Sequence, residues 1–327
     1  ETLTKRLYEI QNGTYVNADK TTLSEYLSKW FDSYVKVNCT ASTARGYRVN
    51  IENHIIPALG NIPLSKLQPV QVQDLYNKKI EQGLSPSTVI YIHRVLHKAL
   101  GQAVKLQMLN RNVTEFVDVP KRKKYHPTVL NEQQVITMLK KAKDTGLYIP
   151  ILLGVTLGLR RGEVLGLRWQ DINWEEKTVS ILQAVVRENK RMIISETKTE
   201  SSRRTLLVSD DLLNTLKKHR IKQNEYRLIM GKAYKDHDLI VCKEDGDIYN
   251  ISYLNKRFKE FVRKQSLPEI RFHDLRHTNA TLMLSKGIHA KVASQRLGHS
   301  TIGITIDLYS HVLKEMQEEA ANLIKGY

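Results

Sequence analysis

The stretch RFHDLRHTNATLML, residues 271–284, places two histidines, His273 and His277, four positions apart with an acid between them. On a helix this spacing presents two imidazoles to one side, as in helices that bind zinc. The same stretch sets His273 and Arg276 three positions apart, which suits gripping a phosphate group. Spacing alone leaves both a metal site and a phosphate site open, so the surrounding chain has to decide between them.

The composition indicates a folded protein with an anionic partner. A chain of 327 residues with 41% hydrophobic residues is long enough for two or three domains, each with its own core. The 51 Lys and Arg against 34 Asp and Glu give a net charge of +17, which favours a polyanion, nucleic acid foremost. Residues 1–120 carry 14 basic and 10 acidic side chains, and residues 121–327 carry 37 and 24. We therefore expect the second part to hold most of that partner.

Cysteines and apolar runs exclude several classes of protein. Cys39 and Cys242 lie far apart and belong to no ligand-like pair, so the sequence predicts neither a disulfide framework nor a cysteine zinc site. This usage is typical of a reducing cytoplasm. The sequence contains neither a signal peptide nor a run of 18 apolar residues, so nothing in it indicates a membrane protein. The chain begins with Glu1 and not with Met, so we expect a further N-terminal region to be missing.

Residues 20–118 have helical patterning throughout. After the turn-rich segment 12–21, Thr22 or Ser24 is a suitable cap for a first helix. Its apolar face would carry Leu23, Tyr26, Leu27, Trp30 and Tyr34. Gly and Pro in 58–69 predict a loop before a second helix, and Ser87 would cap a third, long one. The stripe of this third helix consists of Val89, Ile92, Val95, Leu96, Ala99, Leu100 and Ala103. The region predicts a compact helical bundle.

The segment VPKRKKYHP, residues 119–127, is a proline-bounded basic run without hydrophobic period. Such a run can be a solvated surface loop. Between two domains of a basic protein it is more typical of a linker that lies along a phosphate backbone. The candidate DNA-binding residues here are Lys121, Arg122, Lys123 and Lys124.

Beyond the linker, helical and strand patterns alternate. Residues 130–146 predict a capped amphipathic helix, and the strongly apolar 149–169 predicts helices joined by a tight glycine turn. Between Thr178 and Val208, β-branched runs alternate with polar turns, which predicts an antiparallel meander of three strands. Helical patterning returns from Asp210 onward. The fold class is thus mainly α with a small antiparallel β-sheet.

Several polar residues in this second part are candidates for chemistry. Arg160 follows a Gly-Leu turn amid apolar residues, and a guanidinium there needs a partner, either Glu163 or an external anion. Lys198 lies in a turn between two predicted strands, where lysines are usually solvated. His299 follows Leu-Gly at a predicted helix end, and Tyr309 comes ten residues later. Taken singly, such a tyrosine is more typical of half-buried packing than of a nucleophile.

The order of these segments is more specific than any one of them. GLRRGE, a lysine in a hairpin turn, HDLRH, LGH and YSH together resemble the tyrosine recombinase (phage integrase) family over residues 128–311. The resemblance implies a helical, SAM-like core-binding domain at 20–118, a basic linker at 119–127, and a mixed α/β catalytic domain at 128–327.

The resemblance also assigns roles residue by residue. Tyr309 would attack the scissile phosphate and form a 3′-phosphotyrosyl link. Its implied partners are Arg160 and Arg276 on the non-bridging oxygens, Lys198 as acid for the leaving 5′ oxygen, His273 as general base or acid, His299 as a further donor to the phosphate, and Glu163 as a brace. Fixed cationic donors suit a transition state with concentrated negative charge, and a phenol with a pKa of about 10 needs such neighbours. No metal and no cofactor is implied.

Some positions are ambiguous or depart from the family pattern. Arg161 neighbours Arg160, but the family pattern has the arginine directly after Gly-Leu, which selects Arg160. Asn279 stands where many family members have a second histidine, a position that is not catalytic in the family. Asp274 and His277 are interpreted as structural.

The resemblance further implies partners and a biological role. The partner would be double-stranded DNA, bound by a dimer at each site and a homo-tetramer during recombination, with residues 312–327 as a tail helix that docks on a neighbouring subunit. Residues 1–19 look like the remnant of a link to a missing arm-binding domain, typical of integrases that insert and excise conjugative transposons or prophages. The resemblance also implies an excisionase and DNA-bending host proteins as further partners. It implies the bacterial cytoplasm as the location of the protein.

Three alternatives remain open at this point. Within the family, the chain could be a chromosome-dimer-resolving recombinase. It could also be a DNA-binding regulator of the same fold that does not cut, although the complete residue set argues against this. A metal-dependent relaxase would require a histidine cluster near an N-terminal tyrosine, which the sequence does not contain.

Overall fold

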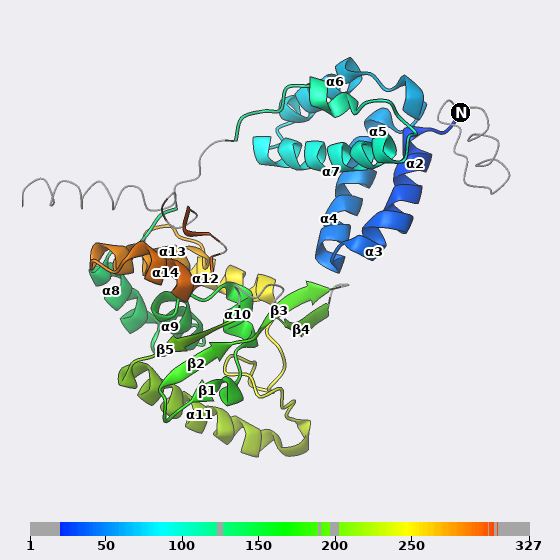
Figure 1. The fold of residues 1–327 in the computed structure, drawn as a ribbon. Helices are drawn as coiled ribbons and strands as arrows, with labels where there is room; N and C mark the ends of the chain where they lie inside the picture. Colours follow the sequence, from blue (N-terminus) through cyan, green and yellow to red (C-terminus); the bar gives the residue numbers. More distant parts are fainter. Residues whose placement is uncertain are drawn as a thin grey trace, which may run out of the picture. The chain divides into compact units, whose positions relative to one another are not determined.

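The computed structural model describes residues 20–122, 127–188, 191–196, 203–299, 301–303 and 306. The chain divides into two compact units, residues 1–125 and 126–327 (Figure 1). Each unit has its own hydrophobic core. In the described part of the chain, no helix is both long enough and apolar enough to span a bilayer.

In its described residues, 20–122, the first unit is built of helices. Two of its helices continue through a π-helical turn into a second α-helical segment. Its elements are α2 (Leu23–Trp30), η1 (Phe31–Val35), α3 (Lys36–Asn38), α4 (Ala41–Asn50), η2 (Ile51–Ile55), α5 (Ile56–Leu59), η3 (Leu64–Lys66), α6 (Pro69–Glu81), α7 (Pro86–Lys105) and η4 (Val113–Phe116). The predicted helical bundle is therefore present.

Helix α2 begins at a capping box. The Thr22 hydroxyl accepts from the backbone N–H of Glu25, and the Glu25 carboxylate accepts from the backbone N–H of Thr22. These two bonds satisfy donors that have no partner within the helix. The predicted apolar face is confirmed, with Tyr34 half-buried and the other four members buried. Of the two proposed caps, Thr22 is the correct one.

Helix α7 begins two residues earlier than predicted. Ser85, not Ser87, is the N-cap, because its hydroxyl accepts from the backbone N–H of Thr88. Pro86 then occupies the first turn, where its fixed φ fits the helix and its missing N–H costs nothing. All seven residues of the predicted stripe are buried. The stripe is set by helical periodicity, whereas the cap depends on one local hydrogen bond.

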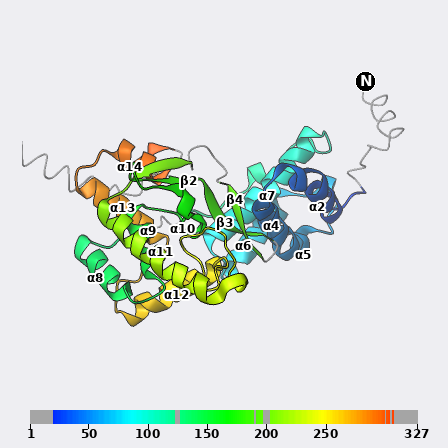
Figure 2. The same ribbon diagram turned by 90° about the horizontal axis from the view of Figure 1, so that it is seen from below.

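The second unit combines helices with two small sheets (Figures 1 and 2). Its helical elements are α8 (Glu132–Ala142), α9 (Tyr148–Thr156), α10 (Arg161–Gly166), η5 (Trp169–Asp171), α11 (Asp210–Met230), η7 (Gly231–Ala233), α12 (Ile251–Lys264), α13 (Asp274–Ser285) and α14 (Ala290–Leu297). Its strands are β1 (Ile172–Asn173), β2 (Thr178–Ile181), β3 (Gln183–Glu188), β4 (Arg191–Glu196) and β5 (Arg204–Leu207).

Helix α9 is the centre of this unit. Every residue from Ile149 to Val155 is buried, and α9 packs against α8, α10 and α13. Gly154 allows the close approach of α13, because a Cβ there would lie 3.1 Å from Cδ1 of Leu275. A helix with seven successive apolar residues buried in this way is typical of a domain centre. It fixes the chain that follows it, which leads into α10.

The predicted three-stranded meander is wrong. The chain from β2 to β3 changes sheet at Leu182: β2 pairs with β1 and β5, while β3 and β4 form a separate hairpin. Helix α10 holds β3 away from β2, since Gln183 Nε2 donates to the carbonyl of Gly166 at 2.8 Å. A Cβ on Gly166 would lie 2.8 Å from Cα of Ala184, so glycine is what lets the strand approach.

The prediction of helical structure from Asp210 onward is only partly correct. Helices α11, α12, α13 and α14 are present, and Figure 2 shows α11 as a long helix across the unit. Residues 234–250 between α11 and α12 form a loop with one isolated bridge between Cys242 and Ile248 and another from Leu239 to Arg168. Asp and Gly within this loop satisfy its backbone locally, as in the bond from Asp247 N to Asp245.

Candidate active site

Arg160 stands at the start of α10, directly after the glycine turn that ends α9. Its backbone N–H donates to Oε2 of Glu163 at 2.9 Å, and its Nη1 donates to Oε1 at 2.8 Å. Its Nη2 donates to the carbonyl of Gly298 at 2.8 Å. The Glu163 side chain is 3% exposed and that of Arg160 is 37% exposed. Glu163 is therefore the partner of Arg160, and one side of the guanidinium still faces solvent.

Arg276 reaches the same turn from α13. The residue is 2% exposed, and its Nη1 donates to the carbonyl of Gly158 at 2.8 Å. Gly158 has φ of +62°, a conformation that glycine adopts without strain. Asn279, one turn further along α13, donates to the carbonyls of Val155 and Thr156. Helix α13 thus holds the end of α9 through two polar side chains.

His273 is the N-cap residue of α13. The residue has an exposed face, and its ring contacts that of His277 edge to face, with centroids 5.0 Å apart. Burial first, and then the neighbouring His277 and Arg276, together lower the pKa of His273 to about 4. His273 is consequently neutral at pH 7 and can accept a proton from a group on its open side.

His299 follows the left-handed cap of α14 at Gly298. Its backbone N–H donates to the carbonyl of Ser294 at 3.1 Å, which is the helix end predicted from Leu-Gly. Burial lowers the pKa of His299 to about 3, with Arg276 and Arg160 as the next causes. The histidine therefore lies within the field of both arginines.

Asp274 supports the start of α13 and is 1% exposed. It accepts from the backbone N–H of Arg271 at 2.7 Å and from its Nε and Nη2 at 3.1 and 2.8 Å. Burial raises the pKa of Asp274, but the bonds from Arg271 outweigh this effect and leave the pKa below its usual value. Asp274 has the structural contact that the sequence suggested.

These contacts surround a place suited to a tetrahedral anion. Arg276 bonds to the carbonyl of Gly158, and Arg160, two residues after that glycine, bonds to the carbonyl of Gly298. His273 lies close to Arg276, and His299 lies close to both arginines. Arginine forks match pairs of phosphate oxygens, and a partly desolvated site strengthens each charge. In the described part of the chain, no three His, Cys, Asp or Glu residues are grouped to hold a metal ion.

Other predicted residues fall elsewhere. Lys198, Tyr309, Lys123 and Lys124 lie outside the described residues, as does the tail 312–327. Lys121 and Arg122 are exposed, and they are the last two residues of the described range 20–122.

Arg204 is a residue that the sequence analysis missed. Its guanidinium donates to both oxygens of Glu163, at 3.3 Å from Nη1 and 2.8 Å from Nη2. Its side chain is 7% exposed, whereas that of the adjacent Arg203 is 53% exposed and pairs with Glu196. The available signal was strand alternation, because Arg204 shares the inward side of β5 with buried Leu206.

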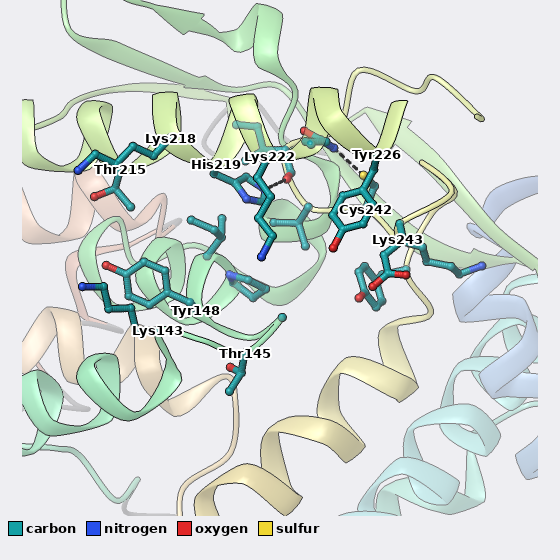
Figure 3. Close-up of a pocket in the computed structure, with 18 of the residues that line it drawn as sticks. Lys143, Thr145, Tyr148, Thr215, Lys218, His219, Lys222, Tyr226, Cys242 and Lys243 are labelled. Atoms are coloured by element: carbon teal, nitrogen blue, oxygen red, sulfur yellow. Dashed lines mark hydrogen bonds between the residues drawn. The ribbon is translucent and has the colours of Figure 1, made fainter. Parts of the chain in front are cut away.

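A separate cavity lies elsewhere in the second unit (Figure 3). It has a volume of about 680 Å³ and lies between the start of α9, α11 and the loop 240–249. Lys143, Lys218, Lys222 and Lys243 line it together with three tyrosines and His219. It shares no lining residue with the arginine and histidine cluster.

Comparison with known proteins gives two family matches that together cover most of the chain. Residues 128–316 match the model of the phage integrase family. Residues 22–80 match the model described as the N-terminal SAM-like domain of phage integrases.

Similar curated proteins span almost the whole chain. A XerC-like tyrosine recombinase of Caldanaerobacter subterraneus is 29% identical and aligns with 96% of this chain and 85% of its own length. The ICEBs1 integrase of Bacillus subtilis is 26% identical over 83% of this chain and 74% of its own. The transposase of transposon Tn916 from Enterococcus faecalis is 25% identical over 93% and 77%.

Solved structures share the fold. The Tn1549 transposon integrase in complex with transposon right end DNA superposes with a TM-score of 0.79 at 20% identity, covering 92% of this chain and all of that one. A lambda integrase tetramer bound to a Holliday junction gives a TM-score of 0.62 at 19% identity, covering 86% and 79%. The mainly helical fold with small antiparallel sheets is therefore that of these integrases.

Proposed function

Because the chain belongs to the phage integrase family, we propose that it is a site-specific tyrosine recombinase that cuts and rejoins DNA through a covalent 3′-phosphotyrosyl intermediate. The observation that carries this proposal is the Gly158 turn, where Arg160 and Arg276 from two different helices converge with His299. Two fixed guanidinium groups at one place can hold the two non-bridging oxygens of a phosphodiester.

In the proposed reaction, the Tyr309 phenolate oxygen attacks the scissile phosphorus and the bond to the 5′ oxygen breaks. Lys198 supplies the proton that the leaving 5′ oxygen takes up. His273 receives the phenol proton, a role supported by its neutral state at pH 7. The reverse attack by a 5′ hydroxyl of another strand releases Tyr309 and rejoins the DNA. Because the covalent link conserves the bond energy, no cofactor is consumed.

Arg160, Arg276 and His299 would act on the phosphate itself. Charge builds up on the equatorial oxygens during attack, and donors that are already fixed by the protein need no rearrangement to meet it. Arg276 is held by the carbonyl of Gly158, and Arg160 by Glu163 and the carbonyl of Gly298. Their preorganisation is what the fold contributes to catalysis.

The proposed substrate is double-stranded DNA. The net charge of +17 favours a polyanion, and solved relatives of the same fold are described in complex with DNA. We assign the first unit as the core-binding domain, the basic segment 119–127 as the linker, and the second unit as the catalytic domain. The proposed assembly is a homo-tetramer in which the tails dock on neighbouring subunits. An excisionase and host DNA-bending proteins are the proposed further partners, and the bacterial cytoplasm is the proposed location.

The biological role we propose is integration and excision of a mobile element. Relatives named as the ICEBs1 integrase and the Tn916 transposase, and the Tn1549 fold match, favour this role. The XerC-like relative at 29% identity favours chromosome-dimer resolution as the second candidate. The two roles differ in the DNA site that recombination requires, which is the ends of a mobile element in the first and a chromosomal resolution site in the second.

The decisive experiment looks for the covalent intermediate. Duplexes selected from random sequence for tight binding supply a site, which is then nicked so that cleavage releases a short fragment and traps the adduct. In EDTA, the wild type should form a protein–DNA adduct, and Tyr309→Phe should bind equally but form none. A regulator that does not cut would bind without any adduct, and an adduct that persists in Tyr309→Phe would overturn the assignment of the nucleophile.

A further inference from the structure

We propose that Arg204 is a positioning residue for the reaction, which neutralises Glu163 and fixes the end of α14 so that Arg160 and His299 keep their places at the phosphate. This inference rests on the proposed function. Arg204 lies on β5, and it is not among the residues to which the resemblance assigned a role.

The first step concerns how its donors are shared. Nη1 and Nη2 of Arg204 bond to the two oxygens of Glu163, and Nε donates to the carbonyl of Arg296 at 2.7 Å. From the other side, Arg160 bonds to the same carboxylate and donates to the carbonyl of Gly298. Both arginines thus connect Glu163 with the last residues of α14.

The second step concerns charge. Arg160 and Glu163 alone would form an electrically neutral pair, which attracts a phosphate weakly. The added charge of Arg204 makes the group of three net positive, and its 7% exposed side chain keeps that charge largely out of water. Opposite charges nearby favour the ionised carboxylate, so Glu163 stays charged and holds Arg160, while the charge of Arg204 offsets that of Glu163 and leaves the attraction of Arg160 for an anion.

The third step concerns geometry. His299 lies directly after the residues whose carbonyls receive the two arginines, Arg296 and Gly298. The fork of an arginine can bind a carboxylate with two nitrogens and a carbonyl with the third, whereas a lysine offers one nitrogen. Displacing the end of α14 would therefore move His299 and release one bond of Arg160 together.

The test compares Arg204→Lys and Arg204→Met with a matched control, Arg168→Lys. Arg168 also grips a buried carboxylate, Asp171, with Nε and Nη2, but contacts none of the cluster. We expect cleavage of the nicked site to slow by about 10-fold in Arg204→Lys and about 100-fold in Arg204→Met. The Kd for the intact site should stay close to the wild-type value, because affinity comes from many phosphate contacts.

Two readouts separate positioning from mere loss of stability. Amide hydrogen exchange should rise at residues 296–299 in both Arg204 variants and stay unchanged there in Arg168→Lys. In a double-mutant cycle, adding Arg204→Lys to Glu163→Gln should slow cleavage of the nicked site little further, since both changes act through one carboxylate. Arg168→Lys should combine with Glu163→Gln multiplicatively.

The outcomes are distinguishable. If the wild type forms no adduct, the proposed function fails. If the wild type forms an adduct and both Arg204 variants cleave at its rate, or if Arg168→Lys is slowed as much as they are, the positioning role is overturned. The same holds if the effects of Arg204→Lys and Glu163→Gln simply multiply.

Discussion

Nη1 of Arg276 donates to the carbonyl oxygen of Gly158 at 2.8 Å, across 118 positions of sequence. This bond joins the buried arginine of α13 to the turn that leads into Arg160. The turn therefore has two functions. It holds Arg276 through the carbonyl of Gly158, and it positions Arg160, which follows two residues later. Both depend on a backbone conformation with φ of +62° at Gly158.

Gly158→Ala should disable the site. A Cβ there would lie 2.4 Å from Cδ2 of Leu297 and 2.7 Å from Oδ1 of Asn279, and the positive φ strains any L side chain. We expect the free energy of unfolding in urea to fall by about 1–3 kcal/mol from strain alone, and covalent adduct formation to be lost. Gly287→Ala is the control, because Gly287 has φ of +77° but nothing within 4 Å. Adduct formation by Gly158→Ala at the wild-type rate would contradict this role of the turn.

The stability of the second unit should depend on pH through its histidines. The pKa values of His273 and His299 are about 4 and about 3 in the folded protein, against an ordinary value of 6.5. The unfolded chain therefore binds protons that the folded chain excludes, so stability is complete above pH 6.5 and falls as the pH drops toward 4. Urea midpoints at pH 7, 6 and 5 should decline less in His273→Gln/His299→Gln than in the wild type. Parallel declines in the two proteins would show that these pKa values are not shifted.

The sequence predicts well whatever depends on periodicity or on neighbours in the chain. The apolar stripes of the first unit and the helix end before His299 are of this kind. Glu163, three positions after Arg160, was one of the two partners that the sequence left open for this arginine, and it is the one found. Each of these features needs only helical geometry and a nearby partner. The choice of Arg160 over Arg161 came from the family pattern and stays a prediction; in the structure, Arg160 bonds to Glu163 and to the carbonyl of Gly298.

What the sequence could not predict depends on distant partners. Arg204 meets Glu163 across 41 positions. Strand alternation separates it from the solvent-facing Arg203 but does not identify the carboxylate that it binds. The change of sheet at Leu182 depends on α10 approaching β3 through glycine, a contact that strand patterning does not encode. Tertiary packing decides both features.

Two glycine substitutions should act in opposite directions. In Gly166→Ala the new Cβ would meet the backbone of Ala184 and Val185 at 2.8–3.0 Å, so α10 and β3 must separate. We expect overpacking to lower the free energy of unfolding of the second unit by about 1–3 kcal/mol.

In Gly101→Ala, within α7, the nearest atom is Nδ2 of Asn112 at 3.7 Å, so helix propensity should raise the free energy of unfolding of the first unit by about 0.5–1 kcal/mol. Thermal unfolding of each variant checks both signs, and a stabilised Gly166→Ala would refute the close approach.

The last prediction uses a motif that the chain contains twice. Asp274 accepts from N, Nε and Nη2 of Arg271, and Asp171 accepts from the same three atoms of Arg168, at 2.7–3.1 Å in both cases. Both aspartates are buried. The two clusters are close to identical in local chemistry, but only Asp274 adjoins a proposed catalytic residue, His273.

Asp274→Ala and Asp171→Ala should therefore lose similar stability but differ in activity. Each removes an acceptor from a backbone N–H at the start of a helical turn, which costs about 0.5–2 kcal/mol in urea unfolding. Only Asp274→Ala frees the turn before α13 and lets His273 move relative to the phosphate, so only this variant should slow adduct formation while binding the site normally. Equal cleavage rates in the two variants would mean that His273 does not depend on Asp274 for its position.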